Sequence, residues 1–366
     1  MALKVAIVGL PNVGKSTLFN ALTQTAAAQA ANYPFCTIEP NEGEVAVPEP
    51  RLPNLARVAG SKEIIPARIT FVDVAGLVRG ASKGEGLGNQ FLANIRDCDA
   101  VAFVTRCFEG GDIIHVEGRV DPLSDLDIIE TELMLADLES LEKRVVNLEK
   151  RAKTDKDSAK TLELVKLALA ELNQGRPARA AFSKVSKEDE KAWWMLQLLT
   201  ALPALYVCNV DEASAGTGND LSARVAERAM RDNAKTVVIS AKIESEIALL
   251  DESERAEFLE TLELEEPGLD RLIHEAYKLL GLQTYFTVGP KEARAWTIPV
   301  GATAPQAAGV IHTDFEKGFI RAETVAYDDF ISLGGEARAR DAGKLRAEGK
   351  TYVVKDGDVM HFLFNG

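Results

Sequence analysis

The stretch from Gly9 to Thr17, GLPNVGKST, carries the clearest chemistry in the sequence. It fits G-x-x-x-x-G-K-[ST], follows the apolar run KVAIV and precedes KSTLFNALTQ, which has helical spacing. In this context the glycines let backbone N–H groups face a phosphate, Lys15 reaches the terminal phosphates, and the Ser16 hydroxyl ligates Mg²⁺. We therefore predict a nucleotide-binding phosphate loop, whose contacting residues are Asn12, Val13, Gly14, Lys15, Ser16 and Thr17.

Two later segments supply groups that such a site needs around Mg²⁺ and the terminal phosphate. Asp73 ends the apolar run ITFVD, where a Mg²⁺-bound water needs a carboxylate, and Gly76 follows at D-x-x-G spacing to donate its N–H to the phosphate. Thr37, in NYPFCTIEPN, is predicted to complete the Mg²⁺ shell as a switch residue; the alternative is an ordinary turn residue. The predicted metal set is Ser16, Thr37 and Asp73, the last through water.

The group that activates water is less obvious from the sequence. Leu77 stands where related switch enzymes carry a water-orienting glutamine, and leucine cannot hold a water. Hydrolysis is therefore expected to be slow. His115, after a Gly-Gly pair in FEGGDIIHVEG, is a candidate to orient or deprotonate water, with a structural loop histidine as the alternative. The predicted catalytic set is His115, Lys15 and Gly76.

The nucleotide base is expected to be read about 200 residues further along the chain. Guanine-binding proteins use N-K-x-D, whose aspartate accepts hydrogen bonds from guanine N1–H and N2–H₂, but this chain has NVDE at 209–212. A longer glutamate need not reproduce that geometry, and loss of paired hydrogen bonds can reverse a preference. The segment SAK (240–242) is expected to complete the pocket. The predicted base-contacting residues are Asn209, Val210, Glu212, Ser240 and Ala241.

The elements that position these residues follow from the hydrophobic pattern. Apolar strands are predicted in KVAIVGL, ARITFVDVAG, DAVAFVTRCF, PALYVCNV and AKTVVIS, separated by helices, which favours a parallel-dominated sheet covered on both faces. Between the third and fourth of these strands the sequence is helical. The 3-4-3 spacing of Leu138, Leu141, Val145 and Leu148 predicts a short coiled-coil seam in an antiparallel hairpin, whose second helix ends at Gly175.

The chain after about Gly281 is rich in β-branched and aromatic residues and predicts a small β-rich domain with one short helix, APQAAGVIH. The predicted fold is α/β, with a nucleotide-binding domain at 1–130 and 200–281, an inserted helical domain at 131–199 and a C-terminal domain at 282–366.

Composition limits the partners. The chain of 366 residues has 46% hydrophobic and 27% charged residues and a net charge of −14, which disfavours non-specific binding to DNA or RNA. No signal segment or apolar run long enough for a membrane span is evident, and four scattered cysteines are expected to be buried, reduced thiols. We expect a cytoplasmic protein without DNA or membrane partners. Five residues form either a basic stripe or an ordinary solvated face on the helical insertion: Lys143, Arg144, Lys150, Arg151 and Lys153.

These motifs also carry a family resemblance. The phosphate loop, NYPFCTIEPN, GLVRGASKGEGLGNQFLANIRDCDA, the helical insertion and the C-terminal segment resemble the YchF (Obg-like ATPase) family over essentially the whole chain. The resemblance implies ATP in preference to GTP, Mg²⁺, ribosomes or translation as partner, and a C-terminal TGS domain of β-grasp fold. Asn12 in related enzymes can help bind a monovalent cation such as K⁺; here it is a candidate for that role or for a loop cap.

The sequence therefore favours a slow ATPase that acts as a molecular switch. The alternatives are a GTPase with relaxed base specificity, a nucleotide-gated binding module with negligible hydrolysis, and, least favoured, a metabolic kinase that uses the same loop. Tighter binding of GTP than of ATP would contradict the first, and ATP turnover above background would contradict the binding module.

Overall fold

The computed structural model describes residues 3–32, 41–74, 87–109 and 120–365, without the side chains of 26–32, 87–90 and Glu252. The chain divides into two compact units. The N-terminal unit comprises Met1–Thr25, Thr37–Gly43 and Thr70–Glu275, and the C-terminal unit comprises Ala26–Cys36, Glu44–Ile69 and Ala276–Gly366. The three-domain division predicted above follows sequence pattern and remains a prediction.

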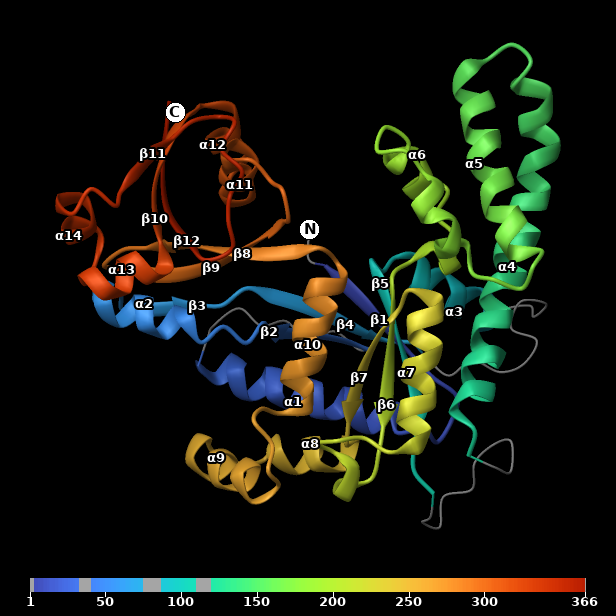
Figure 1. Cartoon of the computed structure of the whole chain (residues 1–366), viewed down its shortest axis with the longest axis horizontal. Helices are drawn as coiled ribbons and strands as arrows, with labels where there is room; N and C mark the ends of the chain where they lie inside the picture. Colours follow the sequence, from blue (N-terminus) through green and yellow to red (C-terminus); the bar gives the residue numbers. More distant parts are fainter. Residues whose placement is uncertain (1–2, 33–40, 75–86, 110–119, 366) are drawn as a thin grey trace. The chain divides into compact units, whose positions relative to one another are not determined.

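A six-stranded sheet in the order β2-β4-β1-β5-β6-β7 organises the nucleotide-binding fold (Figure 1). Its strands β1, β4, β5, β6 and β7 are the five predicted and are mutually parallel. The edge strand β2 runs antiparallel to β4, as hydrogen bonds from Asp73 N to Asn41 O and from Val47 N to Ala67 O show. The strands are β1 (Lys4–Val8), β2 (Glu42–Ala46), β4 (Arg68–Asp73), β5 (Ala100–Arg106), β6 (Ala204–Asn209) and β7 (Lys235–Ile239).

The central strands are buried along their length, which explains their continuous apolar sequences. Helix α1 (Lys15–Asn32) starts directly after the phosphate loop and buries Leu18 and Leu22, as predicted. Helix α7 (Asp220–Asp232) is held by a capping box between Asn219 and Ser222. The remaining helices of the sheet region are α3 (Leu87–Arg96), α7 (Asp220–Asp232), α8 (Ala241–Ile247), α9 (Glu252–Thr261), α10 (Gly268–Leu279) and the 3₁₀ turn η4 (Glu212–Ser214).

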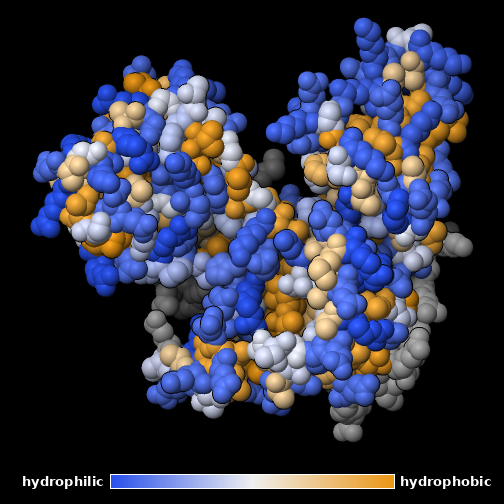
Figure 2. Space-filling model, viewed as in Figure 1, coloured by the Kyte–Doolittle hydropathy of each residue, from blue (hydrophilic) through white to orange (hydrophobic). Residues whose placement is uncertain are grey.

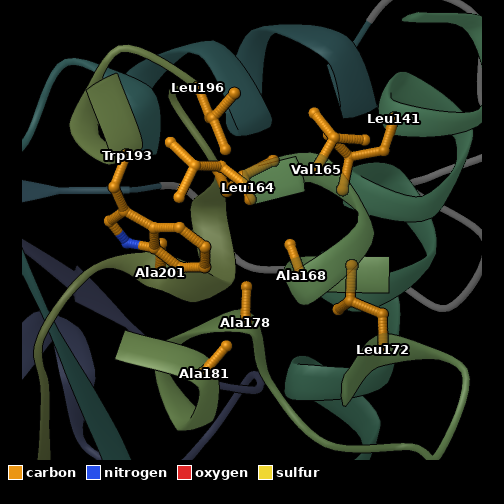
Figure 3. Packing of buried hydrophobic residues seen from close by; sticks show 11 residues of the cluster. Leu141, Leu164, Val165, Ala168, Leu172, Ala178, Ala181, Trp193, Leu196 and Ala201 are labelled. Carbon is orange, nitrogen blue, oxygen red and sulfur yellow. The ribbon is translucent and has the colours of Figure 1, made fainter. Parts of the chain in front are cut away.

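The predicted helical hairpin is present between β5 and β6. It comprises α4 (Pro122–Arg151), α5 (Lys156–Leu172), η2 (Ala178–Lys184), α6 (Glu190–Trp194) and η3 (Leu199–Ala201). Figure 3 shows its core, in which Leu141 lies beside Val165, and Leu164 and Trp193 belong to the same buried cluster. The other three predicted seam residues, Leu138, Val145 and Leu148, pack against this core and are partly buried. Gly175 follows α5 with φ +70°, a conformation that suits glycine at a helix end.

Two polar clusters fasten the hairpin to the sheet. Asp137 on α4 accepts hydrogen bonds from the N–H groups of Leu199 and Thr200 at 2.9 and 2.8 Å, which holds the returning chain just before β6. In the second cluster, Glu130 of α4 contacts Arg179 of η2 and Arg228 of α7, and Tyr206 of β6 lies between them. Pairing of such buried charges lowers the cost of removing them from water.

We call the second cluster the hairpin root; its members are Asp127, Glu130, Arg179, Tyr206, Arg228 and Asp232.

On the face shown in Figure 2, the outer end of the α4–α5 hairpin is mostly hydrophilic. Two members of the proposed basic stripe have partners within the hairpin. Lys143 pairs with Glu139 at 2.6 Å, and Arg144 donates to Leu196 O at 2.8 Å.

The C-terminal unit contains a second sheet, in the order β11-β10-β12-β8-β9-β3. Strands β8 and β12 are parallel, and α11 packs on the sheet with Tyr285, Ile298 and Met360 in the core. The elements are α2 (Arg51–Ala59), β3 (Glu63–Ile65), β8 (Leu282–Val288), β9 (Glu292–Pro299), α11 (Ala304–Ile311), α12 (Thr313–Lys317), β10 (Phe319–Ala326), α13 (Tyr327–Leu333), α14 (Glu336–Asp341), β11 (Arg346–Glu348) and β12 (Asp358–Phe364).

This unit departs from the sequence prediction in two ways. The prediction of one short helix was wrong, because α12, α13 and α14 are present beside α11. The sheet also includes β3, which comes from residues 63–65 and pairs in parallel with β9. Ser61 Oγ donates to Gly289 O at 2.7 Å beside this pairing, and Arg51 pairs with Asp356 at 2.7 Å.

No helix within the described residues is both long and apolar enough to cross a bilayer. The described cysteines, Cys98, Cys107 and Cys208, are buried and free, as predicted for them; Cys36 lies outside the described residues.

Candidate nucleotide-binding site

The phosphate loop connects β1 to α1 and has the backbone conformation that its glycines predict. Gly14 has φ +95°, and a Cβ placed there would lie 2.1 Å from Nδ2 of Asn209. A Cβ at Gly9 would lie 2.9 Å from Val104 O. Asn12 also has positive φ, at 64°. The loop therefore needs glycine at position 14 for two reasons, its left-handed backbone and the close approach of Asn209.

Lys15 and Asp73, predicted from separate motifs, meet at the carboxyl end of the sheet. The pairing of β1 with β4 sets Ile7 beside Asp73, and Lys15 Nζ forms an ion pair with the Asp73 carboxylate. Nζ also donates to Val74 O at 3.0 Å, and Lys15 is only 9% exposed. The site thus holds one cation and one carboxylate in contact, largely shielded from solvent.

The donor set at this point suits Mg²⁺. Ser16 is exposed in the first turn of α1, one residue after Lys15, and Asp73 supplies a carboxylate that is partly accessible. Hydroxyl and carboxylate oxygens are the hard ligands that Mg²⁺ prefers, and Mg²⁺ takes its other ligands from phosphate and water. The described residues therefore fit the metal. Thr37, the third predicted ligand, lies outside the described residues.

Asn209, at the end of β6, joins the phosphate loop to the base segments (residues 209–212 and 240–242). Its Nδ2 donates to Val13 O at 2.9 Å, and its Oδ1 accepts from Ala241 N at 3.0 Å. The side chain is buried, with the residue 4% exposed. One N–H and one lone pair of the amide remain for other partners. The amide thus places Val13 and Ala241 within one site.

The side chains of residues 210–212 differ in whether they are accessible to a ligand. Val210 is buried, and Asp211 caps η4 by accepting from Ser214 N at 2.9 Å. Glu212 remains, at 49% side-chain exposure, and forms an ion pair with Lys242 of α8. That contact with Glu212, followed by the more distant Glu246, raises the pKa of Lys242.

Ser240 contributes a buried polar group next to these residues. It is 2% exposed, and its Oγ has no hydrogen-bond partner among the described residues. A buried hydroxyl without a partner costs about 1–3 kcal/mol. A ligand at the base segments that bonded to Oγ would recover part of this cost.

Glu244, two residues after Lys242, anchors the base segments to α10. Its carboxylate accepts from Gly268 N at 2.8 Å and from Leu269 N at 3.1 Å, at the start of α10. Burial raises the pKa of Glu244 to about 7, and the two backbone donors partly oppose this shift.

Several predicted residues meet at the site, and others cannot be placed. The structure brings together Lys15, Asp73, Asn209 and Ala241, and it shows Glu212 and Ser240 in the adjoining base segments. Thr37, Gly76, Leu77 and His115 lie outside the described residues.

Sequence reasoning gave no role to Lys242 or Glu244. Lys242 is the last letter of SAK, so its place in that motif was an available signal. The contact of Glu244 with α10 spans 24 residues of sequence and has no local signature.

Comparison with known proteins supports a nucleotide-binding family. A family model described as "50S ribosome-binding GTPase" matches residues 4–150. The model YchF-GTPase_C, described as "Protein of unknown function (DUF933)", matches residues 282–365.

Curated relatives match over their full length. Proteins named "Ribosome-binding ATPase YchF" from Pasteurella multocida, Escherichia coli O157:H7 and Bacillus subtilis strain 168 are 56%, 55% and 52% identical to the chain. Each alignment covers 100% of the chain and 100% of the relative.

Solved structures agree on the fold. The "Schizosaccharomyces pombe YchF GTPase" superposes with a TM-score of 0.87 at 38% identity, covering 99% of this chain and 97% of that one. A "GTP binding protein from Pyrococcus horikoshii OT3" has a TM-score of 0.61 at 18% identity, covering 99% of this chain and 100% of that one, and shows the fold alone. The names disagree on the base, since some of these proteins are called ATPases and others GTPases.

Proposed function

Because the chain belongs to the YchF family, we propose that it is an ATP-binding molecular switch that hydrolyses ATP slowly and acts with ribosomes in the cytoplasm. The observation that carries the proposal is the double contact of Asn209, which joins Val13 of the phosphate loop to Ala241 of the base segments. These two contacts support a single site for the phosphates and the base. The ribosome as partner is supported by the names of the relatives.

We propose that the phosphate loop and the first turn of α1 bind the triphosphate. Backbone N–H groups around Gly14, the start of α1 and Lys15 suit anionic oxygens. Ser16, Asp73 through water, and Thr37 would hold Mg²⁺, which supplies positive charge to the phosphates. Since Lys15 Nζ contacts both the Asp73 carboxylate and Val74 O, phosphate and Mg²⁺ compete with these contacts for Lys15 and Asp73.

We propose that Asn209, Val210, Glu212, Ser240 and Ala241 form the base site. The support is the buried Ser240 hydroxyl, which has no partner among the described residues, and the accessible Glu212 carboxylate, which is paired with Lys242. A glutamate in an ion pair is a poor substitute for the free aspartate that reads guanine, which favours ATP.

The hydrolytic step is proposed to use groups outside the described residues. His115 is the candidate to orient water, with Lys15 and the Gly76 N–H stabilising charge on the terminal phosphate. Asn12 is proposed to help bind K⁺. Its positive φ and its position in the phosphate loop are compatible with this role. The hairpin (131–199) and a TGS-type domain (282–366) are proposed to present the nucleotide state to the ribosome.

The test is titration of the purified chain with fluorescent ATP and GTP analogues, with Lys15→Ala as the control for specific binding. We expect ATP to bind more tightly than GTP and Lys15→Ala to bind neither. Turnover of ATP is then followed with K⁺ or Na⁺ and with His115→Ala, and 70S ribosomes are co-sedimented with and without ATP. Tighter GTP binding would support the relaxed GTPase, and binding without turnover under any condition would support the nucleotide-gated module.

A further inference from the structure

Of the three exposed charged residues in the base segments, Asp211 caps η4, and the other two are Lys242 and Glu212. Their side chains are 69% and 49% exposed and form an ion pair through Oε1 of Glu212. The other candidates to read a base are already engaged. Asp211 caps η4, and Asn209 uses one donor and one lone pair within the protein.

Guanine and adenine differ in the number of hydrogen bonds that a carboxylate must accept from them. Its N1–H and N2–H₂ groups are adjacent donors, and a carboxylate pairs with them by using both oxygens at once. Adenine offers one donor, N6–H₂, on that edge beside the acceptor N1, so a single free oxygen is enough. The ion pair with Lys242 is formed through Oε1 of Glu212, and Oε2 has no partner among the described residues.

We infer that Lys242 is a specificity-determining residue, because its ion pair competes with guanine for one Glu212 oxygen and so favours adenine. This inference rests on the proposed nucleotide function and deepens it. Lys242 acts against the wrong base, because guanine must share Oε1 with the Lys242 ammonium or displace it to form both hydrogen bonds. Adenine binds without breaking the pair.

The size of the effect follows from exposure. Ion pairs between solvent-exposed side chains are weak, and breaking one changes an equilibrium constant by about two- to fivefold. Removal of Lys242 is therefore expected to lower the Kd for GTP by about two- to fivefold and to leave the Kd for ATP nearly unchanged. The ATP-to-GTP ratio of Kd values isolates this effect, since both nucleotides carry the same triphosphate.

The experiment measures Kd values of the full chain for ATP, GTP and ITP with Lys242→Met. Inosine has N1–H but lacks the N2 amino group, so ITP cannot use both carboxylate oxygens and should gain less affinity than GTP. Lys166→Met, on an exposed position of α5, changes the net charge equally and is the matched control. Glu212→Gln, alone and with Lys242→Met, completes a double-mutant cycle.

The outcomes separate the inference from the function on which it rests. The inference is supported if Lys242→Met improves GTP more than ITP, and if this gain vanishes in the Glu212→Gln background. An unchanged ATP-to-GTP ratio, an equal gain for ITP, or a gain that persists without Glu212 would overturn it. A wild-type chain that bound neither nucleotide would instead refute the proposed function.

Salt provides an independent readout. Exposed ion pairs are screened by salt, so the wild-type ratio should move toward that of Lys242→Met when KCl is raised from about 0.05 to about 0.5 M. The ratio of Lys242→Met should change little. A wild-type ratio that is insensitive to salt would contradict the role assigned to the ion pair.

Discussion

Replacement of Glu244 by glutamine tests the contact that ties the base segments to α10. The carboxyl group is buried, accepts from Gly268 N and Leu269 N, and has a pKa raised from 4.5 to about 7. The folded chain therefore holds this proton more tightly than the unfolded chain does. The resulting stabilisation is fully present below pH 4.5 and is lost as the pH rises through 7.

The pKa difference gives the expected magnitude. A shift of about 2.5 units corresponds to about 3 kcal/mol over the whole range, and linkage places about 2 kcal/mol of it between pH 5.5 and pH 8. Glutamine cannot ionise, so Glu244→Gln should lack this part of the pH dependence. Relative to the variant, the wild type should gain about 2 kcal/mol of unfolding free energy when the pH falls from 8 to 5.5.

Urea unfolding followed by far-ultraviolet circular dichroism at several pH values measures this difference. Glu246→Gln, at an exposed position of the same helix, controls for the loss of one carboxylate from α8. If wild type and Glu244→Gln keep a constant difference from pH 5.5 to 8, the carboxyl group titrates alike in both states and the reasoning is wrong. If the wild type instead gains stability relative to Glu244→Gln as the pH rises, the pKa of Glu244 is lowered on folding and the reasoning is also wrong.

Three further substitutions test other parts of the structure. Gly14→Ala should weaken binding of a fluorescent ATP analogue at least about tenfold without unfolding the chain, because its Cβ would lie 2.1 Å from Asn209 Nδ2; unchanged affinity would contradict the loop geometry. Leu141 is buried in the hairpin core, so Leu141→Ala should lower the stability of the hairpin by about 2–5 kcal/mol, measured by hydrogen exchange of the α4 and α5 amides. A loss of less than about 1 kcal/mol would contradict this role. Tyr206→Phe removes a hydroxyl 2.9 Å from Asp232 Oδ2 and should cost about 1–3 kcal/mol in urea unfolding, while a neutral effect would show that the hairpin root does not need it.

Much of the fold was predictable because its signals are local. Each central strand is buried on both faces, so its apolar run is continuous and easily recognised. The hairpin seam was predictable for a similar reason, since Leu138, Leu141, Val145 and Leu148 repeat at helical spacing and line one core. The phosphate loop and Asp73 were predictable because their chemistry restricts both residue type and spacing.

The parts that the sequence did not predict depend on distant partners or are very short. Strand β3 has three residues and pairs with β9 more than 220 residues later, so no local pattern marks it. Strand β2, EGEVA, lies at the sheet edge and carries glycine and two glutamates, which are poor strand formers. Helices α12 and α14 have five and six residues, too few to show a helical period.

The candidate site shows the same division. Types and spacing identified Lys15, Asp73 and Asn209, but not which polar atoms remain available once the chain has folded. That depends on contacts such as Lys242 with Glu212 and Asp211 with Ser214, which join or occupy side chains that the motifs treat as equivalent. Specificity is therefore harder to predict than nucleotide binding, because it depends on the hydrogen-bonding capacity that folding leaves unused.

Strand β6 connects the hairpin root with the base segments. Tyr206, in the hairpin root, and Asn209, at the base segments, are three residues apart, or about 10 Å along an extended strand. The strand is buried and paired on both sides by β5 and β7, so it is a rigid connection. A force applied to the hairpin by a partner would therefore act on the ion pairs and hydrogen bonds of the hairpin root before it could displace Asn209.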